Sequence, residues 1–375
     1  MSEVIIVGGG IIGLLTAREL VQSGAQVRLL EQSTLGQEAS WAGGGIVSPL
    51  YPWTYSDPVT ALASWAQDYY PELVSRLYQE TGINAELNAC GLLMLDAPDE
   101  DDALRWAETH NKSMQRYPGA DIQAMEPNLT AHPQQGLWMP YVGNVRNPRL
   151  LKALIASLQQ SPLFSVETHS RVVGFEPSRG ERLQVQAKQG KSAKQVVFEA
   201  DRVVVCSGAW TRQLLESVGV EIPVVPVRGQ MLLFEARPGL INHIILRQGK
   251  YLIPRLDGHI VVGSTLEHTG FEKATTADAR ALLLQHAYSM VSALKEVPVV
   301  AHWSGLRPGS PAGIPYIGLL PGWRNLYVNA GHFRNGLVLA PASARLMADI
   351  VLGRDLIVDP TPYDPAVDRS SEPMH

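Results

Sequence analysis

Residues 4–13 read VIIVGGGIIG, and this stretch decides the fold. The run 4–7 is apolar and β-branched throughout, which is typical of a strand buried on both faces of a sheet. Apolar residues then recur at helical spacing over 11–22, and strand character returns over 25–30, after Gly24. A β-α-β unit of about 30 residues predicts two parallel strands joined by a helix.

The glycines between the first strand and the helix match the pattern G-x-G-x-x-G. Gly8 permits the tight turn, Gly10 lets the backbone approach a pyrophosphate, and Gly13 lets helix and strand pack closely. The N–H groups at the start of the helix, at Ile11 and Ile12, together with the helix dipole, hold phosphates. The turn therefore predicts a dinucleotide site; the alternative is a tight turn without a ligand.

An acidic residue stands where such a site needs one. Glu31 ends the second strand, at about the 20-residue spacing from the glycines where a carboxylate accepts hydrogen bonds from the ribose hydroxyls. A carboxylate there also repels the 2′-phosphate of NADP. We expect Gln32, the next residue, to contact the same part of the cofactor. The turn does not separate FAD from NAD, because both contain an adenosine diphosphate.

Composition and charge exclude several classes of protein. The chain has 375 residues, which predicts two or three domains at about 150 residues each. A net charge of −5 argues against a general nucleic-acid binder. The two cysteines, Cys90 and Cys206, cannot build a disulfide framework or a cysteine-rich metal site. Because there is no basic leader and no apolar run near ~18 residues, we expect a cytoplasmic protein without a membrane span.

The rest of the chain alternates between two kinds of pattern. Helices are predicted over 57–81, 99–117, 147–160, 275–294 and 336–352. Strand-like runs alternate with polar turns over 164–235, and they include a buried-strand run at 201–206. An antiparallel meander is predicted over 241–263, and further strands over 299–306 and 326–329. Parallel β-α-β pieces thus flank antiparallel stretches, which favours an α/β fold of two interleaved domains. We assign 1–80, 145–215 and 300–375 to a dinucleotide-binding domain, and 81–144 and 216–299 to an antiparallel domain.

Four further segments carry a family resemblance. They are ASWAGGGI at 39–46, VVVCSGAW at 203–210, GLRPGSP at 305–311 followed by PYIG at 315–318, and GHFRNG at 331–336. In this order, over nearly the whole chain, they resemble the D-amino-acid-oxidase-like family of FAD-dependent amine oxidoreductases. The resemblance implies a Rossmann-like FAD-binding domain interleaved with an antiparallel-sheet substrate domain. GLRPG and GHFRNG are most similar to the branch that oxidises glycine in bacterial synthesis of the thiamine thiazole.

The resemblance also implies which residues contact FAD. A bulky cofactor lying along the backbone needs small side chains, which explains a second glycine cluster; a flexible loop is the alternative. Val172 would hold the adenine end through its backbone, and is otherwise a plain core residue. The segment expected to lie between pyrophosphate and flavin contributes Ala39, Ser40, Gly44, Gly45 and Ile46.

A second segment would wrap the pyrimidine side of the flavin. The helix that begins there points its positive end at the ring, which stabilises the negative charge of the reduced flavin. Relatives that attach flavin covalently use a cysteine where this chain has Gly305, so the resemblance implies non-covalent FAD. The residues of the wrapping segment are His332, Phe333, Arg334, Asn335, Gly336, Leu337 and Val338.

The substrate end is implied by the same resemblance. Arg307 would anchor the substrate carboxylate, because a guanidinium pairs with a carboxylate through two parallel hydrogen bonds. Tyr251 would add a phenol hydrogen bond, and Arg334 would close the pocket. Gly249 departs from the pattern, since this branch of the family has a polar residue there.

The expected reaction is oxidative deamination of glycine or another small amine that bears a carboxylate. A hydride passes from Cα to flavin N5, the imine hydrolyses to glyoxylate and ammonia, and O2 is reduced to H2O2. No side chain is identified as a certain catalytic base, and His332 is expected to be structural. Three alternatives stay open: an amino-acid dehydrogenase that reduces a quinone, a nicotinamide-dependent dehydrogenase, and a non-catalytic FAD-binding protein. A homo-oligomer is compatible with the sequence.

Overall fold

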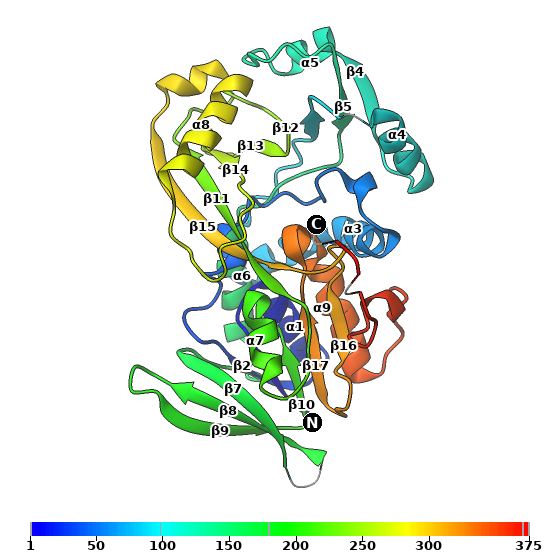
Figure 1. The fold of residues 1–375 in the computed structure, drawn as a ribbon, viewed down its shortest axis with the longest axis vertical. Coiled ribbons are helices and arrows are strands. Elements are labelled where there is room, and N and C mark those ends of the chain that lie inside the picture. The colour runs from blue at the N-terminus through cyan, green and yellow to red at the C-terminus, as the bar shows by residue number, and fades with distance from the viewer. Residues whose placement is uncertain (1, 98, 179–180, 370, 374–375) are drawn as a thin grey trace.

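The computed structural model describes residues 2–97, 99–178, 181–369 and 371–373. Two large sheets organise it, with a six-stranded sheet in the lower half of Figure 1 and an eight-stranded sheet in the upper half. A third sheet of three strands lies at the lower edge. The chain passes several times between the two large sheets, as the interleaved α/β prediction requires.

The six-stranded sheet is the parallel one. Each neighbouring pair is parallel except the edge pair β16–β17. The four apolar residues of β1 are all buried, because elements cover both faces of the sheet. The prediction of a buried first strand is therefore confirmed. In spatial order the strands are β16 (Tyr316–Leu319), β17 (Leu326–Ala330), β10 (Arg202–Val205), β1 (Glu3–Val7), β2 (Gln26–Leu30) and β6 (Phe164–Glu167).

Helices cover one face of this sheet and the small sheet covers the other. The helical core is formed by α1 (Ile11–Gln22), α3 (Asp57–Thr81), α6 (Asn147–Gln159) and α9 (Gly336–Leu352). The opposite core is apolar as well, and α7 packs against β7 on that side. Its elements are β7 (Ser170–Pro177), β8 (Leu183–Gln189), β9 (Lys194–Ala200) and α7 (Thr211–Glu216).

The eight-stranded sheet is antiparallel except where β12 pairs with β3. Helix α8 (Ala277–Met290) packs on one of its faces through an apolar core. Thr276 caps this helix, because its side chain accepts a hydrogen bond from the Ala279 N–H. In spatial order the strands are β15 (Val299–Gly309), β11 (Val225–Phe234), β14 (Ile260–Gly263), β13 (Lys250–Pro254), β12 (Ile244–Arg247), β3 (Leu92–Met94), β5 (Gln135–Met139) and β4 (Gln115–Pro118).

Short elements complete the described chain. Those near the site are α2 (Ala39–Ala42), η3 (Gly208–Trp210) and η5 (Phe333–Asn335). The others are η1 (Pro52–Thr54), α4 (Glu100–Thr109), α5 (Gly119–Met125), η4 (Ser292–Glu296) and η6 (Thr361–Tyr363).

One predicted helix is too long. The expected helix over 99–117 ends at Thr109, and residues 115–118 form β4 instead. Asn111 has a φ of 50°, in the left-handed region that ends a helix. Strand β4 then pairs with β5, a contact between segments about twenty residues apart that helical periodicity does not reveal.

The pairing of β15 bears on the domain boundary predicted at residue 300. Strand β15 pairs along its length with β11 in the eight-stranded sheet, although its residues begin the third segment assigned to the dinucleotide-binding domain. The strand therefore links the two sheets, and the domain boundaries stay a prediction.

One stretch in the described part of the chain is long and apolar enough to cross a membrane. It is Phe333–Leu352, and 72% of its apolar window is buried. Helices α1 and α3 both pack against α9, which makes up most of this stretch. Most of this stretch is thus a buried helix of the core, and the expected absence of a membrane span stays a prediction.

Candidate active site

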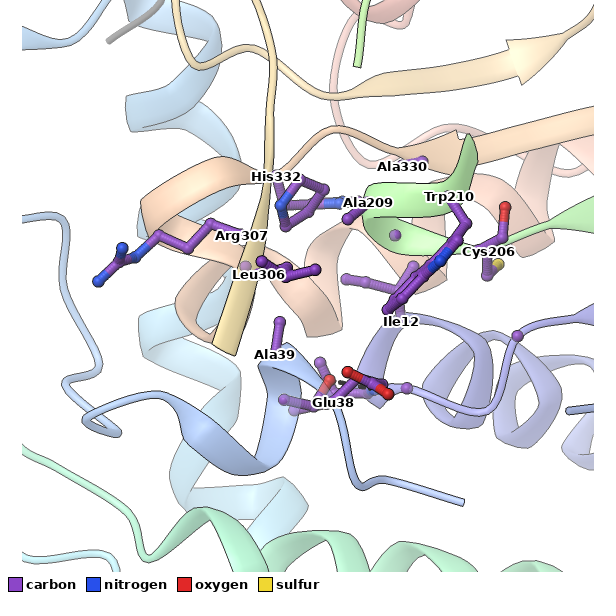
Figure 2. A pocket seen from close by; sticks show the side chains of 18 of the residues that line it. Ile12, Glu38, Ala39, Cys206, Ala209, Trp210, Leu306, Arg307, Ala330 and His332 are labelled. Carbon is purple, nitrogen blue, oxygen red and sulfur yellow. Dashed lines mark hydrogen bonds between the residues drawn. The ribbon is translucent and has the colours of Figure 1, made fainter. Parts of the chain in front are cut away.

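A cavity of about 440 Å³ lies where the two large sheets meet. It opens at the carboxyl ends of β1, β2, β10 and β17, where parallel sheets bind ligands, and it extends to β13 and β15. Its volume is in the range of small-molecule sites. Figure 2 shows Arg307 at one end of the labelled side chains, and Cys206 and Trp210 at the other.

The first glycine turn lies against β10 at the wall of this cavity. Gly8 has a φ of 110°, and a Cβ there would lie 2.4 Å from the Cys206 carbonyl oxygen. A Cβ on Gly13 would lie 2.0 Å from the Gly8 carbonyl oxygen. The Ile11 N–H donates to Ser40 Oγ at 2.9 Å, which joins the start of α1 to α2. Close packing therefore requires glycine at 8 and 13, while Gly10 lines the cavity.

Glu31 connects the second strand to this turn. Its Oε2 accepts a hydrogen bond from the Gly9 N–H at 2.7 Å, and its Oε1 accepts from the Ser33 N–H at 2.8 Å. The side chain is buried and lines the cavity beside Gln32. Oε1 also accepts from the Ser33 hydroxyl at 3.1 Å, so Oε2, which has one protein donor, is the oxygen that keeps acceptor capacity for a ligand hydroxyl.

The second glycine cluster is held by protein contacts. Gly45 has a φ of 83°, and a Cβ there would lie 2.1 Å from the Val145 carbonyl oxygen. A Cβ on Gly44 would lie 2.7 Å from Ile253 Cδ1. The buried Arg255 donates to the Gly44 carbonyl oxygen at 2.9 Å. The chain here packs between the start of α6 and β13. These glycines are therefore needed for the packing of the cavity wall, whether or not a ligand is bound.

The turn before α9 presents polar atoms to the cavity. His332 Nε2 and Asn335 Nδ2 are buried and have no hydrogen-bond partner among the described residues. Asn147 Oδ1 and Asn329 Oδ1 are in the same condition, and all four residues line the cavity. Buried polar groups are almost always hydrogen-bonded, so these atoms fit a polar ligand. Burial lowers the pKa of His332 to about 3, which keeps the ring neutral.

Three predicted substrate residues gather at the other end. Arg307 Nη2 donates to Ser264 Oγ at 2.7 Å, and its Nη1 donates to the Thr265 carbonyl oxygen at 3.2 Å. Burial lowers the pKa of Arg307, Tyr251 opposes that shift, and the nearby charge of Arg334 adds to it. Tyr251 is buried, Arg334 is exposed, and no described carboxylate forms an ion pair with either arginine. Neither guanidinium is therefore neutralised by a direct ion pair in the described part of the chain, although the charge of Glu267 acts on Arg307 from a distance.

Two glycines that departed from the family pattern have structural explanations. Gly249 has a φ of 69°, and its N–H donates to Tyr51 Oη at 3.2 Å. A Cβ on Gly305 would lie 2.5 Å from Ala42 Cβ, so α2 packs directly on this strand. A cysteine at 305 would collide with α2, in keeping with non-covalent FAD.

The structure brings most of the predicted residues to one cavity. Gly13 and Val338 are the exceptions: Gly13 contacts Gly8, and Val338 is buried in the helical core. The residues that line the cavity are Gly8, Gly10, Ile11, Ile12, Glu31, Gln32, Ala39, Ser40, Gly44, Gly45, Ile46, Val172, Tyr251, Arg307, His332, Phe333, Arg334, Asn335, Gly336 and Leu337.

Several lining residues were not predicted. Cys206 and Trp210 follow β10, whose carboxyl end lies beside that of β1, so parallel pairing was the signal that could have found them. Asn147 starts α6, and its Nδ2 donates to the Ser40 carbonyl oxygen at 2.8 Å. No local pattern indicates this contact, because the two residues are distant in the sequence.

Comparison with known proteins identifies the family. A family model described as FAD dependent oxidoreductase matches residues 3–350. The chain belongs to this family. It is therefore an FAD-dependent oxidoreductase, the predicted fold class and cofactor are confirmed, and the nicotinamide alternative is wrong.

Individual relatives are similar over nearly the full chain. A glycine oxidase of Pseudomonas aeruginosa is 49% identical, over 98% of this chain and 99% of its own. The bifunctional protein ThiO/ThiG of a Synechocystis species is 31% identical, over 94% of this chain and 52% of its own. The crystal structure of glycine oxidase from Geobacillus kaustophilus superimposes with a TM-score of 0.91 at 28% identity, covering 98% and 100% of the two chains.

The neutral His332 predicts a pH dependence of stability. Its folded pKa of about 3 lies below the ordinary value of 6.5. Between these two pH values the His332 ring is therefore protonated in the unfolded chain and neutral in the folded chain. Stability is then lost as the pH falls below 6.5. Between pH 6.5 and pH 5 this residue alone is expected to cost about 1.5 kcal/mol. Urea unfolding across that range measures it: His332→Gln should show a shallower decline, and parallel profiles contradict the assignment.

Proposed function

We propose that this chain oxidises glycine and similarly small amines that bear a carboxylate. The observation that carries the proposal is Arg307, a guanidinium without a direct ion pair among the described residues, at one end of the cavity beside the buried Tyr251. A planar donor fork can pair with a carboxylate through two parallel hydrogen bonds, which fixes the orientation of the substrate as well as its charge. The similarity to chains named glycine oxidase supports a small substrate.

The residues around the rest of the cavity fit FAD. The Gly8–Gly13 turn and the start of α1 would hold the pyrophosphate, Glu31 and Gln32 the adenosine ribose, and Val172 the adenine. Residues 39–46 would lie along the cofactor, and residues 332–337 would offer N–H groups and the unpartnered His332 and Asn335 to the flavin. Val338 would act only by anchoring α9 in the core. When bound, FAD accepts the hydride at N5 and reduces O2.

The chain itself contributes binding and orientation. The Arg307 fork would hold the substrate carboxylate, Tyr251 would donate to it, and the exposed Arg334 would close the mouth over it. With a pKa of about 3, His332 is a poor base near neutral pH, so the reactive amine has to lose its proton to water before oxidation. This supports a reaction without a side-chain general base.

Anaerobic addition of glycine to the purified holoenzyme tests the proposal. We expect the visible flavin absorbance to bleach, and in air we expect H2O2 and glyoxylate in equal amounts. A protein that keeps its yellow colour with glycine, sarcosine and D-amino acids is the non-catalytic alternative. Bleaching with dye reduction but no peroxide identifies the dehydrogenase alternative.

The remaining expectations belong to this proposal. The domain assignment, a cytoplasmic location and a homo-oligomeric state are proposals that rest on the sequence and the family. A role in thiamine thiazole synthesis is supported by the similarity to the ThiO/ThiG protein.

A further inference from the structure

The Arg307 guanidinium is held by neutral groups of Ser264 and Thr265, which we call the seat. It donates to Ser264 Oγ and to the Thr265 carbonyl oxygen. It also lies flat against the backbone of β11, since a Cβ on Gly229 would be only 2.1 Å from Nη1. Neutral acceptors orient the guanidinium without cancelling its charge, which stays available to a substrate carboxylate.

The seat lies beyond the regular strand and needs its own support. Strand β14 ends at Gly263, and residues 268–275 are all exposed. Between them, Glu267 exchanges two backbone hydrogen bonds with Arg228 of β11, at 2.8 and 3.0 Å. This bridge returns the chain to the sheet, so residues 264–267 are fixed at both ends.

The side chain of Glu267 also holds this segment, and we call the hydrogen bonds that its carboxylate accepts the clamp. The carboxylate accepts hydrogen bonds from Arg228 Nη2 at 2.5 Å, from Gln230 Nε2 at 2.9 Å and from the Thr265 hydroxyl. The Thr265 hydroxyl in turn accepts from the Gln230 N–H at 2.9 Å. Burial works against its ionisation, yet the hydrogen bonds from Thr265, Arg228 and Gln230 leave the pKa of Glu267 below its usual value. The carboxylate is thus charged at neutral pH.

We propose that Glu267 is a positioning residue that fixes the Ser264–Thr265 seat and through it the Arg307 guanidinium. This inference rests on the proposed function of Arg307 as the carboxylate anchor. The carboxylate is paired with the buried Arg228, so it holds the seat through Thr265 without drawing Arg307 away from the substrate. Losing the clamp should weaken carboxylate binding and leave the hydride step and the cofactor unaffected.

Acetate binding to the holoenzyme, followed by the shift of the flavin spectrum, isolates this effect from turnover. In Glu267→Gln we expect the Kd for acetate and the KM for glycine each to rise about ten-fold, with kcat and FAD content unchanged. Glu80→Gln is the matched control, because Glu80 accepts two hydrogen bonds from the buried Arg18 and one from Ser157 on the helical side of the parallel sheet. Its acetate Kd should match the wild type.

A second pair of variants keeps the test decisive if Glu267→Gln folds poorly. Thr265→Val removes the hydroxyl between clamp and seat but keeps the Arg228–Glu267 pair, and should raise the acetate Kd similarly. Thr265→Ser keeps the hydroxyl and should restore wild-type binding. A wild-type acetate Kd in Glu267→Gln or Thr265→Val, or an equal rise in Glu80→Gln, overturns the inference. A wild-type holoenzyme that neither binds acetate nor is reduced by glycine overturns the proposed function and this inference with it.

Discussion

Arg307→Ala is expected to raise the KM for glycine by about 10- to 150-fold, the equivalent of ~1.5–3 kcal/mol for a charge-assisted pair. Removing the guanidinium leaves the substrate carboxylate without its bidentate partner. Ile12, Cys206 and Trp210 line the part of the cavity proposed to hold the cofactor and lie away from Arg307 (Figure 2), so the substitution should leave them in place. The FAD content, read from the ratio of visible to ultraviolet absorbance, should therefore stay at the wild-type level while steady-state kinetics change.

A surface arginine provides the control for this prediction. Arg116 pairs with Glu100 and Asp101, is 42% exposed, and does not line the cavity. Arg116→Ala should leave the KM unchanged, because exposed ion pairs contribute little. An unchanged KM in Arg307→Ala would remove this residue from the substrate site, and a loss of FAD in the same variant would give it a different role.

Gly45→Ala is expected to destabilise the protein strongly and to release FAD. The left-handed φ of 83° costs an alanine roughly 1–2 kcal/mol. The new Cβ would also overlap the Val145 carbonyl oxygen at 2.1 Å and Asn147 Oδ1 at 2.6 Å, which adds about 1–3 kcal/mol of overpacking. Since the overlap displaces the wall of the cavity, the protein should lose FAD during gel filtration and unfold at lower urea concentration.

Gly24→Ala separates the two causes. Gly24 has a φ of 84°, nearly that of Gly45, but its Cβ would meet nothing within 4 Å. This variant should therefore show only the backbone cost of roughly 1–2 kcal/mol and keep its FAD. If both variants lose the same stability and both keep FAD, the close contact at Gly45 does not shape the cofactor site.

Local sequence was sufficient for the parallel part of the fold. The β-branched run 4–7, the glycines and the apolar periodicity of 11–22 are all short-range signals, and β1 and α1 form where they indicate. The last part of the helix predicted over 99–117 was wrong, because residues 115–118 form β4 through its pairing with β5. Strand pairing between segments that are not adjacent leaves a weaker mark on the sequence than helical periodicity does.

The residues of the site also divide into those that the sequence located and those that only the structure shows. Gly8, Gly13 and Glu31 follow one another in a single β-α-β unit, so spacing alone located them. The family resemblance pointed to Arg307, Tyr251 and the turn before α9. Asn147 and the Glu267 clamp carry no motif, because each acts on a residue far along the chain that only folding brings near.

The sequence by itself determined that this chain forms a dinucleotide turn, and it determined which positions are glycine. Only the tertiary structure decided why several of those glycines are required, because atoms from distant segments occupy the space of a Cβ. These atoms belong to β13 at Gly44, to the segment that enters α6 at Gly45, and to β15 at Gly229. It also decided that the hydrogen-bond acceptors of Arg307 are neutral, so no direct ion pair with a described residue occupies its guanidinium. A turn is specified by neighbouring residues, whereas steric fit and electrostatic compensation depend on every segment that packs against it.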